Sequence, residues 1–375
     1  MNIEIKEVLT RKDLKTFVRF PYQLYRGSSC WVPLLDIDEL NTLRRDRNPA
    51  FEHCESRYWL AYKEGRPVGR IAAILNHRHI ETWDQRYLRF GWVDFIDDPE
   101  VSAALFAAVE DWARQNGMTA VHGPLGFTDM DREGMLVEGF DQLGTLATYY
   151  NHPYYPAHLK QLGYLKDTDW VEYEISLPQE PVEKIARAAA IVMRRSKLKL
   201  LEVSSKKELL AYAEELFQIL NDEYAHLYGV VPLTERQVQH YIKQYFDYIR
   251  PDYVPVVLDE NGRMVAFGIT MPSLSLALQK AGGKLFPFGL LHLLRALGKT
   301  DRMDLYLVAV RSEYQGKGVN AILIDRMTRT FLKLGVNKIE SNPELESNHN
   351  VQGQWKYFET RQHKRRRCFI RHLDD

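Results

Sequence analysis

The sequence predicts an α/β protein, of the α+β type, built from two similar domains that each contain a mixed twisted sheet flanked by helices. Its 375 residues exceed the usual size of a single domain. The 45% of apolar residues is enough for proper hydrophobic cores. Two prolines bracket the polar pair at 178–181 and end a strand-like segment. We therefore expect two domains, at 1–178 and 179–375.

The second half alternates patterns typical of strands and helices. Thr234 and Gln237 have the spacing of a capping box, and Asn261-Gly262 between two apolar runs is typical of a hairpin. Gly335 is placed to end the last long helix. We expect strands at 198–203, 253–258, 264–271, 304–310 and 338–341, and helices at 182–197, 206–228, 234–249 and 319–334.

The first half repeats this order of elements. Gly117 and Gly335 are 218 residues apart, and the same offset aligns Ala104-Leu105 with Ile322-Leu323. A tandem duplication explains such self-similarity. We expect strands near 3–8, 58–62, 68–75, 89–95 and 119–122, and a helix at 101–116.

Charge and cysteine content exclude several classes of function. The 50 Lys and Arg residues balance 50 Asp and Glu residues, so no net charge recruits nucleic acid or an anionic membrane. Three cysteines without C-x-x-C spacing provide neither a disulfide framework nor a zinc ribbon. The most apolar stretch, 285–297, is shorter than the roughly 20 residues of a membrane span. We expect a cytoplasmic protein without a metal, a nucleic-acid partner, a signal peptide or a transmembrane helix.

A glycine-bearing turn joins an apolar strand to a helix in the second half. Glycines let a ligand approach the backbone, and the amides and dipole of a helix N-terminus favour phosphate. The same turn could also be an ordinary strand-to-helix connection. Its spacing matches neither of the two common nucleotide loops. The candidate diphosphate-binding residues are Val308, Val310, Gln315, Gly316, Lys317, Gly318, Val319 and Asn320.

This turn resembles the acetyl-CoA loop of the GNAT acetyltransferase superfamily, Q/R-x-x-G-x-G/A after a strand. Val310, Gln315 and Gly318 fit that pattern, whereas Asn320 stands where the family usually has glycine or alanine. The resemblance implies acetyl-CoA or another acyl-CoA as co-substrate and direct transfer of the acyl group to an amine. It also implies that the strand at 304–310 offers backbone amides to the thioester and the pantetheine arm.

The resemblance implies further site residues. Asn350 and Tyr357 have the seven-residue separation of the family's asparagine, which helps hold the cofactor arm, and its tyrosine, which protonates the departing thiolate. Phenol and thiol pKa values lie within about two units, so this proton transfer is well matched. A tyrosine at this spacing is equally common in a core. Asp304 and Glu340 are candidate bases by strand position, and Glu223 and Tyr224, on the helix that faces the acceptor cleft in the family, are equal candidates.

The first half lacks the cofactor turn. The 218-residue offset places Asp97-Asp98-Pro99-Glu100 opposite Gln315-Gly316-Lys317-Gly318, and like charges beside a diphosphate cost on the order of 1 kcal/mol or more each. Leu159 occupies the place of the tyrosine. We expect one coenzyme A site, in the second half, and a first half that supports the fold or shapes the acceptor cleft.

Several alternatives remain open from the sequence. The chain is an N-acyltransferase for a small-molecule or peptide amine, or a GNAT-fold binding module without turnover. The apolar insertion at 274–300 lines an acyl channel or packs on a domain or dimer surface, and a homodimer is left open. The basic cluster at 363–372 is expected to be solvated, and 129–134 imitates a calcium loop without its final glutamate.

Overall fold

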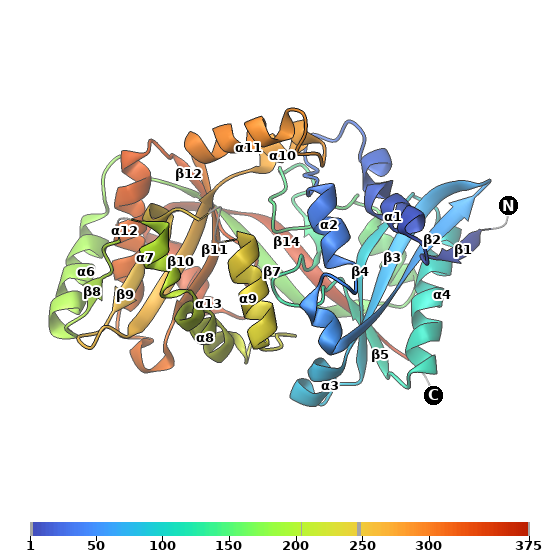
Figure 1. Ribbon diagram of the computed structural model, residues 1–375, viewed down its shortest axis with the longest axis horizontal. Coiled ribbons are helices and arrows are strands. Elements are labelled where there is room, and N and C mark those ends of the chain that lie inside the picture. Colours follow the sequence, from blue (N-terminus) through green and yellow to red (C-terminus); the bar gives the residue numbers. More distant parts are fainter. Residues whose placement is uncertain (1–2, 204, 246–248, 374–375) are drawn as a thin grey trace. The chain divides into compact units, whose positions relative to one another are not determined.

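The computed structural model describes residues 3–203, 205–245 and 249–373 and confirms the α/β class (Figure 1). The chain forms two compact units. Unit 1 comprises Met1–Val171, Leu274–Leu293 and His363–Asp375, and unit 2 comprises Glu172–Ser273 and Leu294–Gln362. Both units are discontinuous in sequence, and the predicted boundary at residue 178 stays a prediction.

Unit 1 is built on one mixed sheet of order β1-β2-β3-β4-β5-β14, with β6 also pairing with β14. The pairings are antiparallel except for the parallel pair β4 and β5. Its strands are β1 (Glu4–Glu7), β2 (Cys54–Lys63), β3 (Arg66–Asn76), β4 (Tyr87–Phe95), β5 (Ala120–Gly123), β6 (Met135–Glu138) and the end of β14 (Glu359–His372). Its helices are α1 (Arg11–Leu24), α2 (Asp36–Thr42), η1 (Pro49–Glu52), α3 (His77–Trp83), α4 (Pro99–Gln115), α5 (Tyr155–Gln161) and α10 (Ser275–Ala281).

The unit 1 sheet has a hydrophobic core on each face because successive strand residues point to opposite sides. Along β2, Trp59 belongs to the core that contains α4 and α5. Its neighbours Tyr58 and Leu60 belong to the core that contains Phe17 of α1. Helices therefore cover both faces of the sheet.

Unit 2 repeats the plan with the order β7-β12-β11-β10-β9-β8, in which β11 and β12 are the parallel pair. Its core lies between the sheet and the helices α6 and α12. Its strands are the end of β7 (Leu165–Ser176), β8 (Lys199–Leu200), β9 (Val256–Leu258), β10 (Met264–Pro272), β11 (Arg302–Val310), β12 (Lys338–Glu340) and β13 (Glu344–Leu345). Its helices are α6 (Glu183–Arg195), α7 (Lys206–Leu210), α8 (Ala213–Tyr224), α9 (Glu235–Tyr245), η3 (Pro251–Tyr253), η4 (Ser312–Tyr314), α12 (Val319–Lys333), α13 (His349–Gln352) and η5 (Gly353–Tyr357), while α11 (Gly289–Gly298) begins in unit 1.

The sixth strand of each sheet comes from the other half of the sequence. β7 lies in the first half of the chain, and its end pairs with β12 of unit 2. β14 closes the chain, and its end pairs with β5 of unit 1. A fragment that starts at residue 179 would therefore lose a strand of the unit 2 sheet.

Most expected elements are present, with one clear difference. The capping box is confirmed, since Thr234 N–H donates to Gln237 Oε1 at 2.9 Å and Gln237 N–H donates to Thr234 Oγ1 at 3.2 Å. The single helix expected at 206–228 is wrong: it divides into α7 and α8 around Tyr212, the N-cap residue of α8. The end of the helix expected at 234–249 lies partly outside the described residues.

The expectation that the basic cluster is solvated is wrong. Lys364 and Arg366 are buried on β14. Arg365 donates to Asp169 Oδ2 at 3.1 Å, and Arg367 donates to Asp169 Oδ1 at 2.7 Å. Burial alone would raise the pKa of the Asp169 carboxyl, but hydrogen bonds from Arg367 and Arg365 hold that pKa below its usual value. Arg365 and Arg367 of the cluster are thus paired with a buried carboxylate inside unit 1.

We expect Asp169→Asn to lower the free energy of unfolding by about 2–3 kcal/mol at pH 7, because it leaves the half-buried guanidinium groups of Arg365 and Arg367 without their buried carboxylate. The folded state favours the ionised carboxyl, so the difference from wild type is full above about pH 5 and shrinks as the pH falls through the lowered pKa. Urea unfolding at several pH values measures this difference. Asp111→Asn is the control, since that side chain is 69% exposed beside Arg114, and a loss equal to the control would contradict the assignment.

Candidate functional site

The predicted glycine turn forms the connection from β11 to α12 in unit 2. Gly316 and Gly318 have φ values of 70° and 84°, in the left-handed region that favours glycine. Gly318 is the N-cap residue of α12 and supplies no side-chain hydrogen bond. A Cβ at Gly316 would meet nothing within 4 Å. The start of α12 is therefore bare backbone.

This bare helix start presents hydrogen-bond donors. No described residue accepts from the backbone N–H groups of Gly316, Gly318, Val319 or Asn320. The first N–H groups of a helix have no partner inside it and lie at the positive end of its dipole. The 15-residue helix α12 thus begins with a group of amides suited to an anion such as a phosphate.

Glu223 and Gln315 hold the turn that precedes these amides. Glu223 Oε1 accepts from Ser312 N–H at 2.8 Å, and Glu223 Oε2 accepts from Gln315 Nε2 at 2.9 Å. Gln315 Nε2 also donates to Val310 O at 2.9 Å. The side-chain amide of Gln315 is thereby used to fix the turn, which positions the glycines that follow.

β12 pairs with only part of β11, the strand that leads into the turn. In the described residues the parallel ladder of β11 and β12 covers only 302–304 with 338–340, whereas β11 continues to Val310. The β10 ladder skips Tyr306, which marks a bulge. Asn342 Nδ2 donates to Tyr306 O at 2.9 Å. The two strands therefore separate just where the bulge lies.

Tyr224 lies at the strand segment next to the turn. Its hydroxyl donates to Val308 O at 2.9 Å and accepts from Val308 N–H at 3.4 Å. The two backbone groups of one strand residue point to the same side, and residues two apart share that side. Tyr224 and Asn342 thus both contact one edge of β11. The sequence indicated Tyr224 only as one of several candidates and did not indicate Asn342.

The candidate bases Asp304 and Glu340 lie opposite each other on β11 and β12. Both side chains are buried. Burial, followed by the neighbouring carboxyl of Asp304, raises the pKa of the Tyr306 phenol well above its usual value. The structure therefore brings the two predicted carboxyl groups together at the point where the strands separate.

Tyr357 and Asn350 follow in the segment after β13. Tyr357 ends η5 and is 39% exposed, with the ammonium groups of Lys184 and Lys356 each 5.1 Å from its ring centroid. Asn350 is exposed on α13, and the neighbouring Asn348 caps that helix. None of the contacts described for Tyr357 or Asn350 involves β11. Their predicted roles stay predictions.

Glu344 is a titratable residue that sequence reasoning missed. Its Oε1 accepts from Trp355 Nε1 at 2.9 Å, while its buried Oε2 has no hydrogen-bond partner among the described residues. Burial raises the pKa of the Glu344 carboxyl to about 7. Glu344 follows Asn342, which contacts the bulge of β11, by two residues. No sequence signal distinguishes this glutamate, because its burial is a tertiary property.

The corresponding helix start in unit 1 is closed by its own side chains. Asp98 is the N-cap residue of α4, and its carboxylate accepts from Glu100 N–H at 3.0 Å. Lys63 Nζ lies 2.7 Å from Asp98 Oδ2, and this hydrogen bond lowers the pKa of Asp98. Asp97 Oδ1 lies 2.9 Å from His158 Nε2. A carboxylate thus accepts from the first N–H groups of α4, whereas the start of α12 has no side-chain cap.

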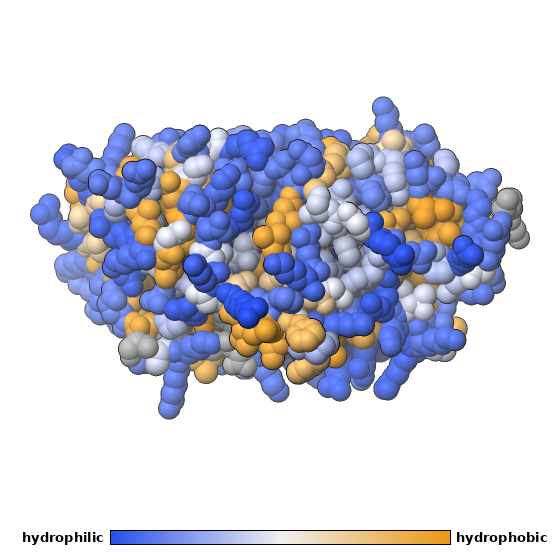
Figure 2. Space-filling view, turned by 90° about the horizontal axis from the view of Figure 1, so that it is seen from above, coloured by the Kyte–Doolittle hydropathy of each residue, from blue (hydrophilic) through white to orange (hydrophobic). Residues whose placement is uncertain are grey.

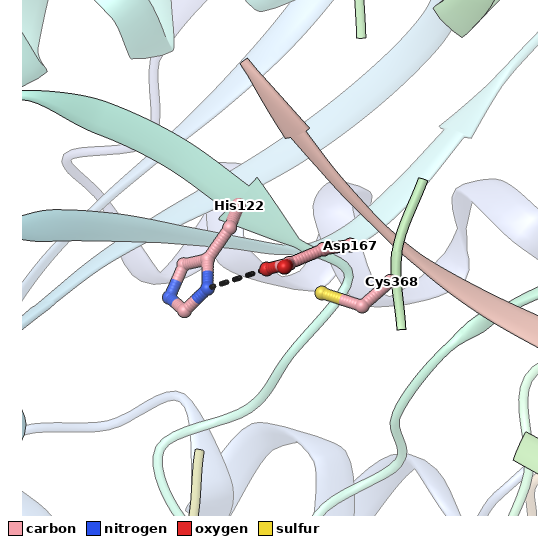
Figure 3. A group of neighbouring side chains, drawn as sticks. All are labelled: His122, Asp167 and Cys368. Atoms are coloured by element: carbon pink, nitrogen blue, oxygen red, sulfur yellow. Dashed lines mark ion pairs between the residues drawn. The ribbon is translucent and has the colours of Figure 1, made fainter. Parts of the chain in front are cut away.

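Unit 1 also contains a group that could hold a metal ion (Figure 3). His122 Nδ1 lies 4.0 Å from Asp167 Oδ2, and Cys368 lies beside them, with the three ligand atoms within 4.8 Å of one another. Burial lowers the pKa of His122 well below its usual value, so the imidazole is neutral. In the calcium-like segment, Asp131 instead accepts from Phe127 N–H at 2.8 Å and closes its own loop.

Comparison with known proteins identifies relatives of both the sequence and the fold. Residues 213–358, which include the turn and α12, match the model of the acetyltransferase (GNAT) family. Protein YghO of Escherichia coli (strain K12) is 31% identical over 383 residues, which cover 98% of this chain and 95% of YghO. The bacterial ceramide synthase of Caulobacter vibrioides is 29% identical over 92% of this chain and 91% of that protein. A tandem GNAT protein from the clavulanic acid biosynthesis pathway shares the fold over 100% of both chains, with a TM-score of 0.58 and 12% identity.

Proposed function

The chain belongs to the GNAT acetyltransferase family, and we propose that it is an N-acyltransferase that moves an acyl group from an acyl-CoA to an amine through unit 2. The observation that carries this proposal is the group of backbone donors at Gly316, Gly318, Val319 and Asn320. The match to the GNAT family model covers this segment, at 213–358.

Coenzyme A fits this helix start chemically. Its diphosphate needs several donors in a small space, and the bare amides of α12 provide them without a bulky side chain at Gly316 or Gly318. Lys317 adds a positive charge to the same turn. Val308 and Val310 bring the strand edge to this point and would lie along the pantetheine arm, with Asn350 as a proposed second contact. We infer one such site per chain, because the start of α4 is closed by Asp98.

The proposed reaction is direct transfer. The thioester supplies an activated acyl carbon, a neutral amine attacks it, and the carbon–sulfur bond breaks as the amide bond forms. A base takes the proton of the amine, and a phenol protonates the departing thiolate. We assign the phenol to Tyr357, with Tyr224 as the alternative that already contacts β11. Asp304, Glu340 and Glu344 are the proposed bases, and the pKa of Glu344 near 7 is the best matched to neutral pH.

The proposed acceptor is the amine of a long-chain lipid. A ceramide contains an amide bond between a fatty acid and a long-chain amino alcohol, and a ceramide synthase is similar to this chain over almost its full length. We therefore place this chain in the same class of reaction, with a fatty acyl-CoA as donor. Acetyl-CoA with a small or peptide amine is the alternative, and a coenzyme A-binding module without turnover is a second alternative.

Wild-type protein is expected to release one thiol for each amide formed from a fatty acyl-CoA and a long-chain amino alcohol. Tyr357→Phe should lower turnover roughly ten- to a thousandfold while coenzyme A affinity stays within a few-fold, because loss of an acid affects the transition state more than ground-state binding. A thiol assay with mass spectrometry of the product measures both. Tyr224→Phe is the matched variant, and the larger loss identifies the acid.

Coenzyme A binding without amide formation from any amine would instead support the binding module. Amide formation only from acetyl-CoA and small amines would exclude the lipid acceptor. Unchanged turnover in Tyr357→Phe would return Tyr357 to a packing role.

Asn320→Asp should weaken coenzyme A binding at least about tenfold, because it places a carboxylate at the helix start that we assign to the diphosphate. The substitution keeps the size of the side chain, and an acidic residue in the first turn favours the helix itself. Calorimetry with coenzyme A is expected to give a stoichiometry near one for wild type. The control Asn320→Gln should bind within about threefold of wild type, and Asp98→Ala should leave the stoichiometry at one. Two sites per chain, or equal affinity of Asn320→Asp and wild type, would refute the assignment.

Glu344→Gln should remove the acidic limb of the pH–rate profile. A base works only when ionised, so wild-type turnover should rise as the pH increases through about 7, the pKa of Glu344. The variant should have low turnover that no longer rises in this range. Turnover measured from pH 5.5 to pH 9 tests this, with Glu346→Gln in the same loop as the control. An unchanged limb near pH 7 in Glu344→Gln would transfer the role to Asp304 or Glu340.

A further inference from the structure

Residues 274–298, within the insertion predicted at 274–300, expose a cluster of large apolar side chains, most of them in unit 1, and we call these residues the apolar segment. Phe286 is 75% exposed and Phe288 is 66% exposed. Leu276, Leu290 and Leu291 are also exposed. Single exposed apolar residues are ordinary on a protein surface, but a run of them within 16 residues marks an interaction site.

Helix α11 exposes three of its five leucines. Gly289 and Leu293 are its buried residues, whereas Leu290, Leu291 and Leu294 are exposed. A helix on the surface of a water-soluble protein normally turns its apolar stripe to the core. Gly289 and Leu293 are the residues of this helix that pack in the core. Leu290, Leu291 and Leu294 therefore remain available for contact with a partner.

The apolar segment is held firmly by the rest of unit 1. Leu278 is buried, and Gln279 Nε2 donates to the carbonyl oxygens of Ser29 and Trp31, each at 2.9 Å. Gly283 O accepts from Asp36 N–H at 2.9 Å. A Cβ at Gly283 would lie 1.7 Å from the hydroxyl of Tyr22, so the close approach requires glycine. The exposed residues are therefore presented by an anchored support.

The charged side chains of the apolar segment itself are all basic, and the neighbouring carboxylate of Asp36 is paired with Arg19. Residues 261–300 contain no Asp or Glu in a chain whose total charge is balanced. The same stretch has exposed basic side chains at Lys280, Lys284, Arg295 and Lys299. Apolar side chains next to Lys and Arg are the combination that enters the interface of an anionic bilayer.

The space-filling view is consistent with this mixture. Figure 2 looks onto the side on which α10 and α11 are drawn in Figure 1, and it shows apolar residues interspersed with hydrophilic ones. No described helix is long and apolar enough to cross a membrane. The ten residues of α11 are about half the length of a membrane span, so the helix can lie in the interface but cannot cross it.

We propose that the apolar segment docks unit 1 on the surface of an anionic phospholipid bilayer, with Phe286 and Phe288 inserted among the acyl chains and the basic side chains at the headgroups. This inference goes beyond the proposed acyl transfer and does not depend on it. A second copy of the chain would also cover the leucines, but a symmetric contact between two copies of this surface would bring basic side chains of one copy towards those of the other. Charge complementarity therefore favours the bilayer.

The test is co-sedimentation of the full chain with vesicles of phosphatidylcholine containing phosphatidylglycerol. We expect wild type to bind these vesicles, and Phe286→Glu/Phe288→Glu to lower the partition coefficient at least about tenfold. Lys280→Ala/Lys284→Ala should lower binding roughly tenfold on anionic vesicles and little on neutral ones. Leu9→Glu and Leu165→Glu are matched controls, since these leucines are 79% and 68% exposed elsewhere in unit 1, and they should stay within about twofold of wild type.

Two outcomes would overturn the proposal. One is a wild-type protein that binds coenzyme A and does not bind anionic vesicles. The other is a dimer in light scattering that Phe286→Glu/Phe288→Glu dissociates, without vesicle binding by wild type. Coenzyme A affinity of each variant shows that it is folded, and it separates failure of the docking from failure of the proposed function.

Discussion

The first N–H groups of a helix have no partners inside the helix, and the two units treat these groups in opposite ways. In unit 1 the carboxylate of Asp98 accepts from the start of α4 and pairs with Lys63. In unit 2 Gly318 provides no side chain, so the start of α12 retains its donors. Among the described residues, the same strand-turn-helix order thus produces a helix start closed by a carboxylate in one unit and a helix start with unpaired N–H groups in the other. The location of the candidate site depends on this difference.

The strand before the turn adds a second open feature. The ladder of β11 and β12 ends at Asp304 and Glu340, so the remainder of β11 has an edge that β12 does not cover. Tyr224 and Asn342 reach this edge from α8 and from the loop after β12. In the described part of the chain, unpaired amides at the helix start and a strand edge that only side chains contact are two features that a ligand with a diphosphate head and an amide-containing arm could use. The acyl-CoA proposal uses both features together.

Local sequence patterns predicted most of the helices and strands. They predicted neither the long-range strand pairings nor the burial of charged side chains and its effect on their pKa values. Thr234 and Gln237 could be identified as a capping box because the motif is a short-range interaction. The pairing of β14 with β5 has no local signal, since the partners are more than 240 residues apart. The sequence predicted Lys364 and Arg366 to be solvated, because the long-range packing that buries them also has no local signal. In the candidate site, glycine spacing indicated the turn, whereas the raised pKa of Glu344 follows from burial that only the fold creates.

The apolar segment and the proposed lipid acceptor are inferred from different observations, and their physical chemistry agrees. Each methylene transferred from a bilayer to water costs about 0.8 kcal/mol, so a long-chain amine rarely leaves the membrane unaided. An enzyme that acts on such an amine gains from staying at the interface, where the amine is concentrated. The surface of 274–298 has the two properties that hold a protein there, exposed apolar side chains and basic side chains with no Asp or Glu in the segment itself. Transfer to a small water-soluble acceptor would not require Phe286 and Phe288 to be exposed to water. The lipid acceptor therefore accounts for a surface that the acyl-transfer chemistry alone leaves unexplained.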